Sequence, residues 1–125
     1  YALNVANRVC GFVNANSLFQ RVVPYCLDCK VDIEIYNRNR IDLYNKLTEL
    51  GFKCVKPVGA FYMFPETPIE DDVAFCNAAK EFNLLLVPGS GFGCKGHMRL
   101  SYCVSHDTII NSFPAFEKLA AKFIK

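Results

Sequence analysis

The sequence predicts an α+β fold in which helices cover one small sheet of three or four mixed or antiparallel strands. The chain has 125 residues, the size of one ordinary domain. Its apolar residues recur every three or four positions in some segments and form short continuous runs in others. The resulting order is two helices, two strands, a helix, two strands and a helix. Mixed order of this kind indicates an α+β layer.

The first half of the chain is dominated by helical patterns. Residues 1–8 are expected to be extended, with no turn before them. From Ser17 to about Lys30, apolar pairs recur every four residues, which predicts a helix that Pro24 kinks or begins. A clearer apolar stripe predicts a helix over Ile33–Leu50, and Gly51 provides its stop.

Strand patterns and a helix start follow. Phe52–Val55 and Ala60–Phe64 are expected to be strands. The next helix is expected to open at Thr67, which caps it, with Pro68 at its first position and Glu70 completing a capping box.

The last third of the chain completes the predicted sheet. Leu84–Val87 and Met98–Cys103 are apolar runs that predict two more strands. Ser105 is expected to cap a closing helix. Pro114 lies well inside that helical pattern, so we expect a kink or two consecutive helices there.

Composition and charge favour a folded cytoplasmic domain. Apolar residues make up 52% of the chain, which argues against disorder. The formal net charge is +2, and the nearest approach to a basic patch, Asn37–Arg40, is interpreted as the solvated face of a helix. We therefore expect no nucleic-acid partner. No apolar run is long enough to span a membrane, and Tyr1–Asn4 does not resemble a signal peptide.

The seven cysteines are interpreted as reduced thiols that behave as small apolar side chains. Cys26 and Cys29 form a C-x-x-C, the pattern of a redox pair or of half a zinc site. A zinc site needs a second close pair, and Cys94 and Cys103 are too far apart in sequence to provide one convincingly. A metal or redox protein is thus the least favoured interpretation.

The glycine-rich segment Gly89–Gly96 is the first candidate functional element. Gly91 and Gly96 have the spacing of a phosphate-binding Walker loop, but His97 follows where lysine is required. A strand follows the segment instead of a helix, which excludes a dinucleotide fingerprint. Its glycines indicate tight turning and close backbone approach, with a plain surface turn as the alternative.

Arg99 is the second candidate. In a strand, Arg99 and Ser101 point to one face while Met98, Leu100 and Tyr102 point to the other. A planar guanidinium forms two parallel hydrogen bonds with a carboxylate, a geometry that lysine cannot match. At this point a bound carboxylate and an internal ion pair with a local Asp or Glu both remain open.

Three motifs occur in order: PVGAFYMFP at Pro57–Pro65, LVPGSGFG at Leu86–Gly93 and MRLSY at Met98–Tyr102. Together they resemble the C-terminal small domain of the class I/II aminotransferases of the aspartate aminotransferase fold. That domain contains a G-A-F-Y-type strand, a V-P-G-S-x-F-G loop and an R-[IL]-S-Y strand. The resemblance extends more loosely through the helix Ile33–Leu50 and the closing helix, and so covers most of the chain.

The resemblance implies an enzyme that uses pyridoxal 5'-phosphate to transfer an amino group between an amino acid and a 2-oxo acid. In that family the arginine of the R-[IL]-S-Y strand holds the substrate α-carboxylate, a role that falls on Arg99. Phe61 is implied as a wall of the substrate pocket, with an ordinary core position as the alternative. Tyr62 and Tyr102 are expected in the core, and Pro88–Gly96 is implied to be a mobile wall.

The resemblance also implies that the cofactor is held elsewhere. In the family, a lysine in an S-[KT]-x-[FY]-type stretch upstream of this region forms a Schiff base with the cofactor. That context is absent around five lysines of the chain: Lys30, Lys46, Lys53, Lys56 and Lys95. We therefore expect residues 1–125 to be a fragment, inactive alone, with no catalytic, cofactor-binding or metal-binding residue of its own. Residues 1–8 are expected to be a remnant of the missing large domain.

The substrate and the parent are expectations of the same resemblance. The parent is expected to be a homodimer, and aspartate is favoured over aromatic or broad-range substrates. Aspartate needs a second cation for its side-chain carboxylate, which the partner subunit is expected to supply. The main alternative is a non-catalytic module of the same fold that binds small carboxylates or a partner protein.

Overall fold

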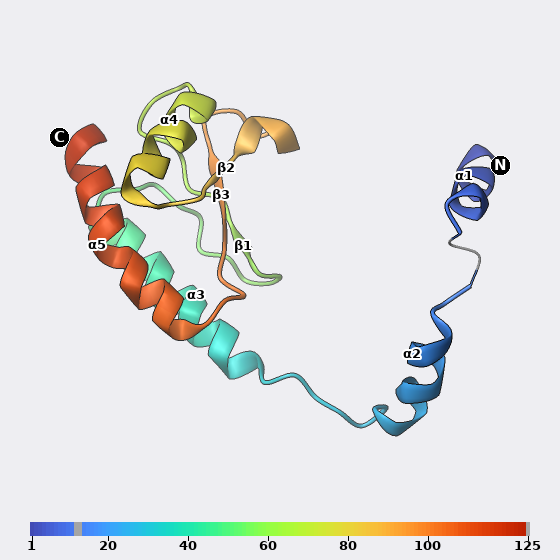
Figure 1. Ribbon diagram of the computed structural model, residues 1–125. Coiled ribbons are helices and arrows are strands. Elements are labelled where there is room, and N and C mark those ends of the chain that lie inside the picture. Colours follow the sequence, from blue (N-terminus) through green and yellow to red (C-terminus); the bar gives the residue numbers. More distant parts are fainter. Residues whose placement is uncertain (12–13, 125) are drawn as a thin grey trace. The chain divides into compact units, whose positions relative to one another are not determined.

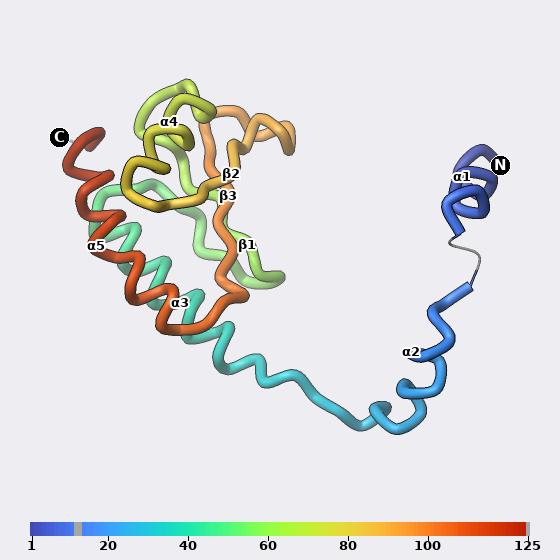
Figure 2. Tube along the Cα trace, viewed as in Figure 1, coloured from blue at the N-terminus to red at the C-terminus, as the bar shows by residue number. Residues whose placement is uncertain are grey.

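The computed structural model describes residues 1–11 and 14–124 of the chain (Figure 1, Figure 2). The chain divides into two compact units, Tyr1–Val31 and Asp32–Lys125. Neither unit contains, in its described residues, a helix with the length and apolar character needed to cross a membrane.

The described part of the first unit is helical. Its elements are α1 (Ala2–Val9), α2 (Ser17–Val22) and the 3₁₀ helix η1 (Val23–Tyr25). The prediction that residues 1–8 are extended is therefore wrong. The segment ALNVANRV carries alanine, leucine and arginine, which favour helix, and no glycine or proline to oppose it. None of the described residues among 1–31 is buried.

The second helix is shorter than the pattern predicts. Asn16 caps α2, since its side-chain oxygen accepts a hydrogen bond from the backbone N–H of Leu18 at 2.9 Å. Pro24 has no backbone N–H, and it lies in the first turn of η1. The α-helix therefore ends at Val22, and the predicted extension to Lys30 does not form.

The second unit is a three-stranded antiparallel sheet with helices packed against it. Its elements are α3 (Ile33–Glu49), β1 (Tyr62–Met63), α4 (Asp72–Ala79), η2 (Lys80–Phe82), β2 (Val87–Pro88), η3 (Gly89–Phe92), β3 (Met98–Ser101) and α5 (His106–Phe123). The strand order is β1-β3-β2, with β3 in the middle. The predicted α+β class with a small sheet is confirmed.

The core lies between the sheet and the helices. α3 and α5 run side by side (Figure 1), and α4 packs against β2. Leu47 on α3 and Leu119 on α5 are fully buried, as are Phe75 on α4 and Met98 on β3. This single core holds β3 in place, and β3 carries Arg99.

None of the four predicted strands forms over its whole predicted length. Phe52–Val55 forms no strand, and pairing in the other three is limited to Tyr62–Met63, Val87–Pro88 and Met98–Ser101. Phe52 is buried, but its backbone N–H donates to Leu47 and closes the end of α3. In Leu84–Val87, Leu85 is 85% exposed, and pairing begins only at Val87.

The start of α4 also differs from the prediction. The hydroxyl of Thr67 donates to the carbonyl of Ile69 at 2.7 Å and does not cap a helix. Asp71 is the cap, because its Oδ1 accepts from the backbone N–H of Ala74 at 2.9 Å. The helix consequently begins at Asp72, and Pro68 lies before it.

The closing helix α5 forms as one unbroken element. Ser105 caps it, as predicted, by accepting from the N–H of Thr108 at 3.2 Å. Of the two outcomes expected at Pro114, a kink or two consecutive helices, the second is wrong. Pro114 is exposed, where water can replace the N–H donor that the carbonyl of Ile110 has lost.

Candidate functional site

Arg99 lies on the middle strand of the sheet, on the face opposite the core. In β3, Met98 and Leu100 are buried, whereas Arg99 is half-buried and Ser101 is exposed. This is the division of faces that the alternation predicts. Val87 of β2 pairs directly with Arg99. β1 pairs with the next two residues, Leu100 and Ser101, so β3 has a paired strand on each side.

Two aromatic rings hold the guanidinium of Arg99. Its Cζ lies 4.2 Å from the ring centroid of Phe92 and 4.5 Å from that of Tyr62. Both distances are well inside the range of cation–π attraction. Phe92 is 52% and Tyr62 38% exposed, so the arrangement is open to solvent. The prediction that Tyr62 belongs to the core is wrong, since it lies on the outward face of β1.

Arg99 has no acidic partner within the described residues. No Asp or Glu there forms an ion pair with it, although other basic side chains do have such partners. The internal ion pair that the sequence left open is thus not formed. Aromatic contact orders the guanidinium while leaving its in-plane N–H groups free to donate to an anion.

The segment before β3 makes a tight turn that presents Phe92. The N–H of Gly89 donates to the carbonyl of His97 at 2.8 Å, and the N–H of Cys94 donates back to the carbonyl of Gly89 at 3.0 Å. A Cβ at position 89 would collide with the carbonyl oxygen of Cys94 and lie 2.8 Å from that of His97. Close backbone approach is therefore the reason for this glycine, as predicted.

A buried carboxylate holds the same turn. Oδ2 of Asp72 accepts a hydrogen bond from the backbone N–H of Ser90 at 2.6 Å. Asp72 is 2% exposed, and such burial of an aspartate normally requires a partner, which here is the Ser90 N–H. The Ser90 N–H favours the charged form and holds the pKa of Asp72 below its ordinary value. The sequence does not reveal this role, because an acidic residue next to a helix start has the same pattern as an ordinary cap.

Phe61 immediately precedes β1 and lies next to Tyr62, the first residue of that strand. Their ring centroids are 4.9 Å apart, and Phe61 is 47% exposed. The core alternative for Phe61 is therefore wrong. The hydroxyl of Tyr102, a buried residue as predicted, donates to the carbonyl of Ala60 at 2.8 Å. Ala60 has φ of 59°, so this bond holds a left-handed turn just before Phe61.

A buried amide fixes the chain at the C-terminal end of β3, although its sequence context predicts a solvated face. Asn39 of α3 is fully buried. Its Nδ2 donates to the carbonyls of Tyr102 at 3.1 Å and Val104 at 2.8 Å. Its Oδ1 accepts from Nδ1 of His106 at 3.0 Å, in the tautomer that carries a proton there. The interpretation of Asn37–Arg40 as a solvated face is wrong at Asn39.

The described lysines do not fit the attachment site of pyridoxal phosphate. That chemistry needs a desolvated lysine with a lowered pKa. Lys46 lies 2.7 Å from Glu117, and this hydrogen bond raises its pKa. All the other described lysines are exposed, among them Lys53 and Lys95, which pair with Glu66 and Glu70. No step through the cofactor is therefore assigned to the described residues of this chain.

The C-x-x-C lies in the first unit, where Cys26 and Cys29 are both exposed and free. Among the seven cysteines only Cys76 is buried, and its burial raises its pKa to about 11. The view of the cysteines as small apolar side chains therefore holds for Cys76 and for Cys54, which is half-buried against the core and whose pKa burial also raises to about 11. Within the described residues, no three His, Cys, Asp or Glu side chains are grouped so that they could hold a metal ion.

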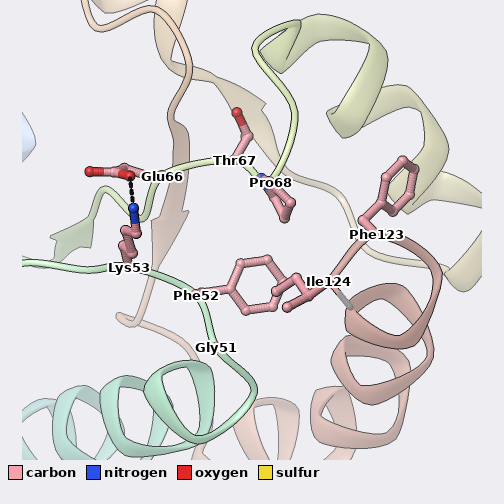
Figure 3. Close-up of a pocket in the computed structure, with 8 residues that line it drawn as sticks. All are labelled: Gly51, Phe52, Lys53, Glu66, Thr67, Pro68, Phe123 and Ile124. Carbon is pink, nitrogen blue, oxygen red and sulfur yellow. Dashed lines mark ion pairs between the residues drawn. The ribbon is translucent and has the colours of Figure 1, made fainter.

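A surface pocket lies on another part of the second unit, where the segment after α3 meets the end of α5 (Figure 3). Phe52, Phe123 and Ile124 form its apolar side. Lys53 and Glu66 face each other across 3.8 Å at its polar side. None of the lining residues belongs to the group around Arg99, so the two features are distinct.

Comparison with protein families gives one match over most of the chain. A family model described as "Aminotransferase class I and II" matches residues 19–112. Among curated proteins, an aspartate/prephenate aminotransferase of Thermus thermophilus is 37% identical over 91 residues, which cover 71% of this chain and 24% of that protein. An aspartate aminotransferase of Geobacillus stearothermophilus is 43% identical over 76 residues, covering 54% of this chain and 19% of that protein.

Solved structures show the same likeness. The crystal structure of an aminotransferase from Eubacterium rectale is 48% identical, with a TM-score of 0.83, over 96% of this chain and 30% of that chain. The aspartate aminotransferase of Thermus thermophilus solved with maleate is 36% identical, with a TM-score of 0.66, over 69% of this chain and 23% of that chain. This chain thus spans less than a third of the length of these proteins.

Proposed function

Because the chain belongs to the class I and II aminotransferase family, we propose that it is the substrate-binding small domain of a pyridoxal-phosphate-dependent aminotransferase. In this proposal Arg99 binds the α-carboxylate of the amino acid. The complete enzyme, a longer protein that contains this chain, transfers the amino group between an amino acid and a 2-oxo acid.

The proposal rests mainly on the surroundings of the Arg99 side chain. Its guanidinium lies over Phe92 and Tyr62 and has no acidic partner among the described residues. A carboxylate that enters the open face can accept two parallel hydrogen bonds from it. Phe61 lies beside Tyr62 and supplies an apolar wall next to the bound substrate.

The rest of the active site belongs, in this proposal, to a large domain. The described lysines lack the environment that the cofactor requires, so the lysine that binds pyridoxal phosphate lies outside them. Exposed apolar side chains of the first unit, among them Leu3, Val9 and Phe19, provide surface for packing against that domain. Residues 1–8 are assigned to it, and the complete enzyme is assigned a homodimeric, cytoplasmic state.

Aspartate is the favoured substrate. Several similar curated proteins carry the name aspartate aminotransferase, and one similar structure was solved with maleate, a dicarboxylate. A second cation for the side-chain carboxylate is assigned to the partner subunit. The measurement that tests this choice is the ratio of kcat/KM for aspartate and phenylalanine. A ratio in favour of phenylalanine would contradict it.

The role of Arg99 is tested by the substitution Arg99→Lys in the complete enzyme. Lysine keeps the charge but cannot form the paired hydrogen bonds, so KM for the amino acid should rise and kcat/KM should fall. The expected loss is about 2–4 kcal/mol. Arg38→Lys is the matched control, because Arg38 is exposed on α3 and pairs with Asp42. Kinetics of Arg99→Lys that match those of the control would exclude the assignment.

A further inference from the structure

Two successive aspartates at the start of α4 have different partners. Asp71 caps the helix through the N–H of Ala74. Asp72 is the first residue of the helix, yet its Oδ2 turns to another segment and accepts from the N–H of Ser90 at 2.6 Å. Since Asp71 already caps the helix, the burial of Asp72 is explained by the turn that it holds and not by capping.

The turn held by Asp72 is short and closed on itself. Ser90 is the second residue of η3, and its carbonyl accepts from the N–H of Gly93 at 3.1 Å. Gly93 has φ of 74°, a left-handed conformation that lets the turn close. Phe92 lies between these residues. Fixing the backbone of Ser90 therefore restricts where the ring of Phe92 can lie.

The ring of Phe92 has contacts on two sides. It packs edge-on against Phe64, with centroids 6.1 Å apart, and it lies 4.2 Å from Cζ of Arg99. Half of this side chain is exposed, so packing alone does not hold it. A further constraint comes from the hydrogen bond between Asp72 and Ser90, two residues that are 18 positions apart in the sequence.

We propose that Asp72 is a positioning residue for the Arg99 site: its carboxylate holds the turn Gly89–Gly93 so that the ring of Phe92 stays over the guanidinium. Asp72 acts through Phe92 and does not touch the substrate. This inference rests on the proposed role of Arg99 in binding the substrate carboxylate.

The test is Asp72→Ala in the complete enzyme, with steady-state kinetics and maleate binding as readouts. Loss of the acceptor frees the turn, so KM and the dissociation constant of maleate should rise about two- to fivefold, no more than in Phe92→Leu, while kcat changes little. Asp72→Asn keeps an oxygen that accepts from Ser90 and should recover most of the affinity.

Asp71→Ala is the matched control, since it removes the neighbouring carboxylate and the helix cap. It should lower the melting temperature with KM unchanged. The double variant Asp72→Ala/Phe92→Leu tests the path, because Asp72→Ala should have no further effect on KM once the ring is absent. The proposal would be overturned if the effects of Asp72→Ala and Phe92→Leu on KM were additive in the double variant. It would also be overturned if KM for Asp72→Ala equalled that for Asp71→Ala.

Arg99→Lys measured in parallel separates the two claims. A raised KM in Arg99→Lys together with a wild-type KM in Asp72→Ala would overturn the positioning role and leave the proposed function standing. A wild-type KM in Arg99→Lys would instead remove the proposed function on which the positioning role rests.

Discussion

Many partly buried arginines are ordered by an ion pair with a carboxylate, whereas the guanidinium of Arg99 is ordered by two aromatic rings. Phe92 and Tyr62 order the guanidinium through cation–π contact and packing, and they leave its hydrogen-bond donors unused. An ion pair with the protein would have to be broken before a substrate carboxylate could bind. Aromatic contact requires no such exchange, which suits a site that binds and releases an anion.

The ring of Phe92 should contribute to substrate binding through its contact with Arg99. Phe92→Leu keeps an apolar side chain but removes the π-system over Arg99. An exposed cation–π contact contributes about 0.5–1 kcal/mol, so KM for the amino acid in the complete enzyme should rise roughly two- to fivefold. Tyr62→Phe retains its ring and should leave KM unchanged. Equal KM values for both variants would contradict the role of the Phe92 ring.

A second prediction concerns the pH dependence of stability through Asp72. The Ser90 N–H lowers the pKa of Asp72 in the folded chain below the unfolded value of about 4. The carboxylate therefore stabilises the fold above that unfolded value, and this contribution is lost as pH falls through the folded pKa.

Urea unfolding of the chain and of Asp72→Asn, at a series of pH values from neutral to strongly acidic, measures this contribution. The wild-type chain should be the more stable at neutral pH, and the difference should shrink in acid. A difference that stays constant across the series would contradict the linkage.

Residue identities predicted part of the site. The outward position of Arg99 followed from strand alternation, and the need for Gly89 followed from the tight turn. The outward positions of Tyr62 and Phe61 did not follow, because an aromatic residue in a strand fits either a core or an exposed face. Asp72 was missed because its partner, the backbone of Ser90, leaves no mark in the sequence.

At the scale of the elements, the helices were easier to predict than the strands. α3 and α5 carry apolar residues through several turns, and their ends agree with capping signals at Gly51 and Ser105. Each strand has only two to four paired residues. Such short pairing depends on contacts between distant segments, so neighbouring residues do not specify it.

Asn39 links α3 to the segment that follows β3, and this link should stabilise the fold. Asn39 donates to the carbonyls of Tyr102 and Val104, and these bonds are buried or partly buried. Asn39→Ala leaves both carbonyls without this donor and should lower the free energy of unfolding by about 1–3 kcal/mol. Chemical denaturation of the chain measures this loss.

Asn45→Ala is the control for that substitution, because Asn45 is exposed on the same helix. Its effect should stay within about 0.5 kcal/mol. A similar, small change in both variants would show that the buried amide does not stabilise the junction.

For the whole molecule, the central feature is a proposed carboxylate-binding face on a chain whose described lysines do not suit the cofactor. The sheet, helices and core of the second unit position Arg99. The similarity to longer aminotransferases supports the proposal that the cofactor is bound by residues other than the described ones. Motif order predicted this family from the sequence, whereas the helix at the start of the first unit was not predicted.

The most direct test of the central claim is a crystal structure of the complete enzyme with maleate bound. One carboxylate of maleate should accept two hydrogen bonds from the Arg99 guanidinium, at about 2.7–2.9 Å, with Phe92 and Tyr62 still beside it. A structure in which maleate binds elsewhere, while Arg99 pairs with an acidic side chain of the protein, would contradict the account.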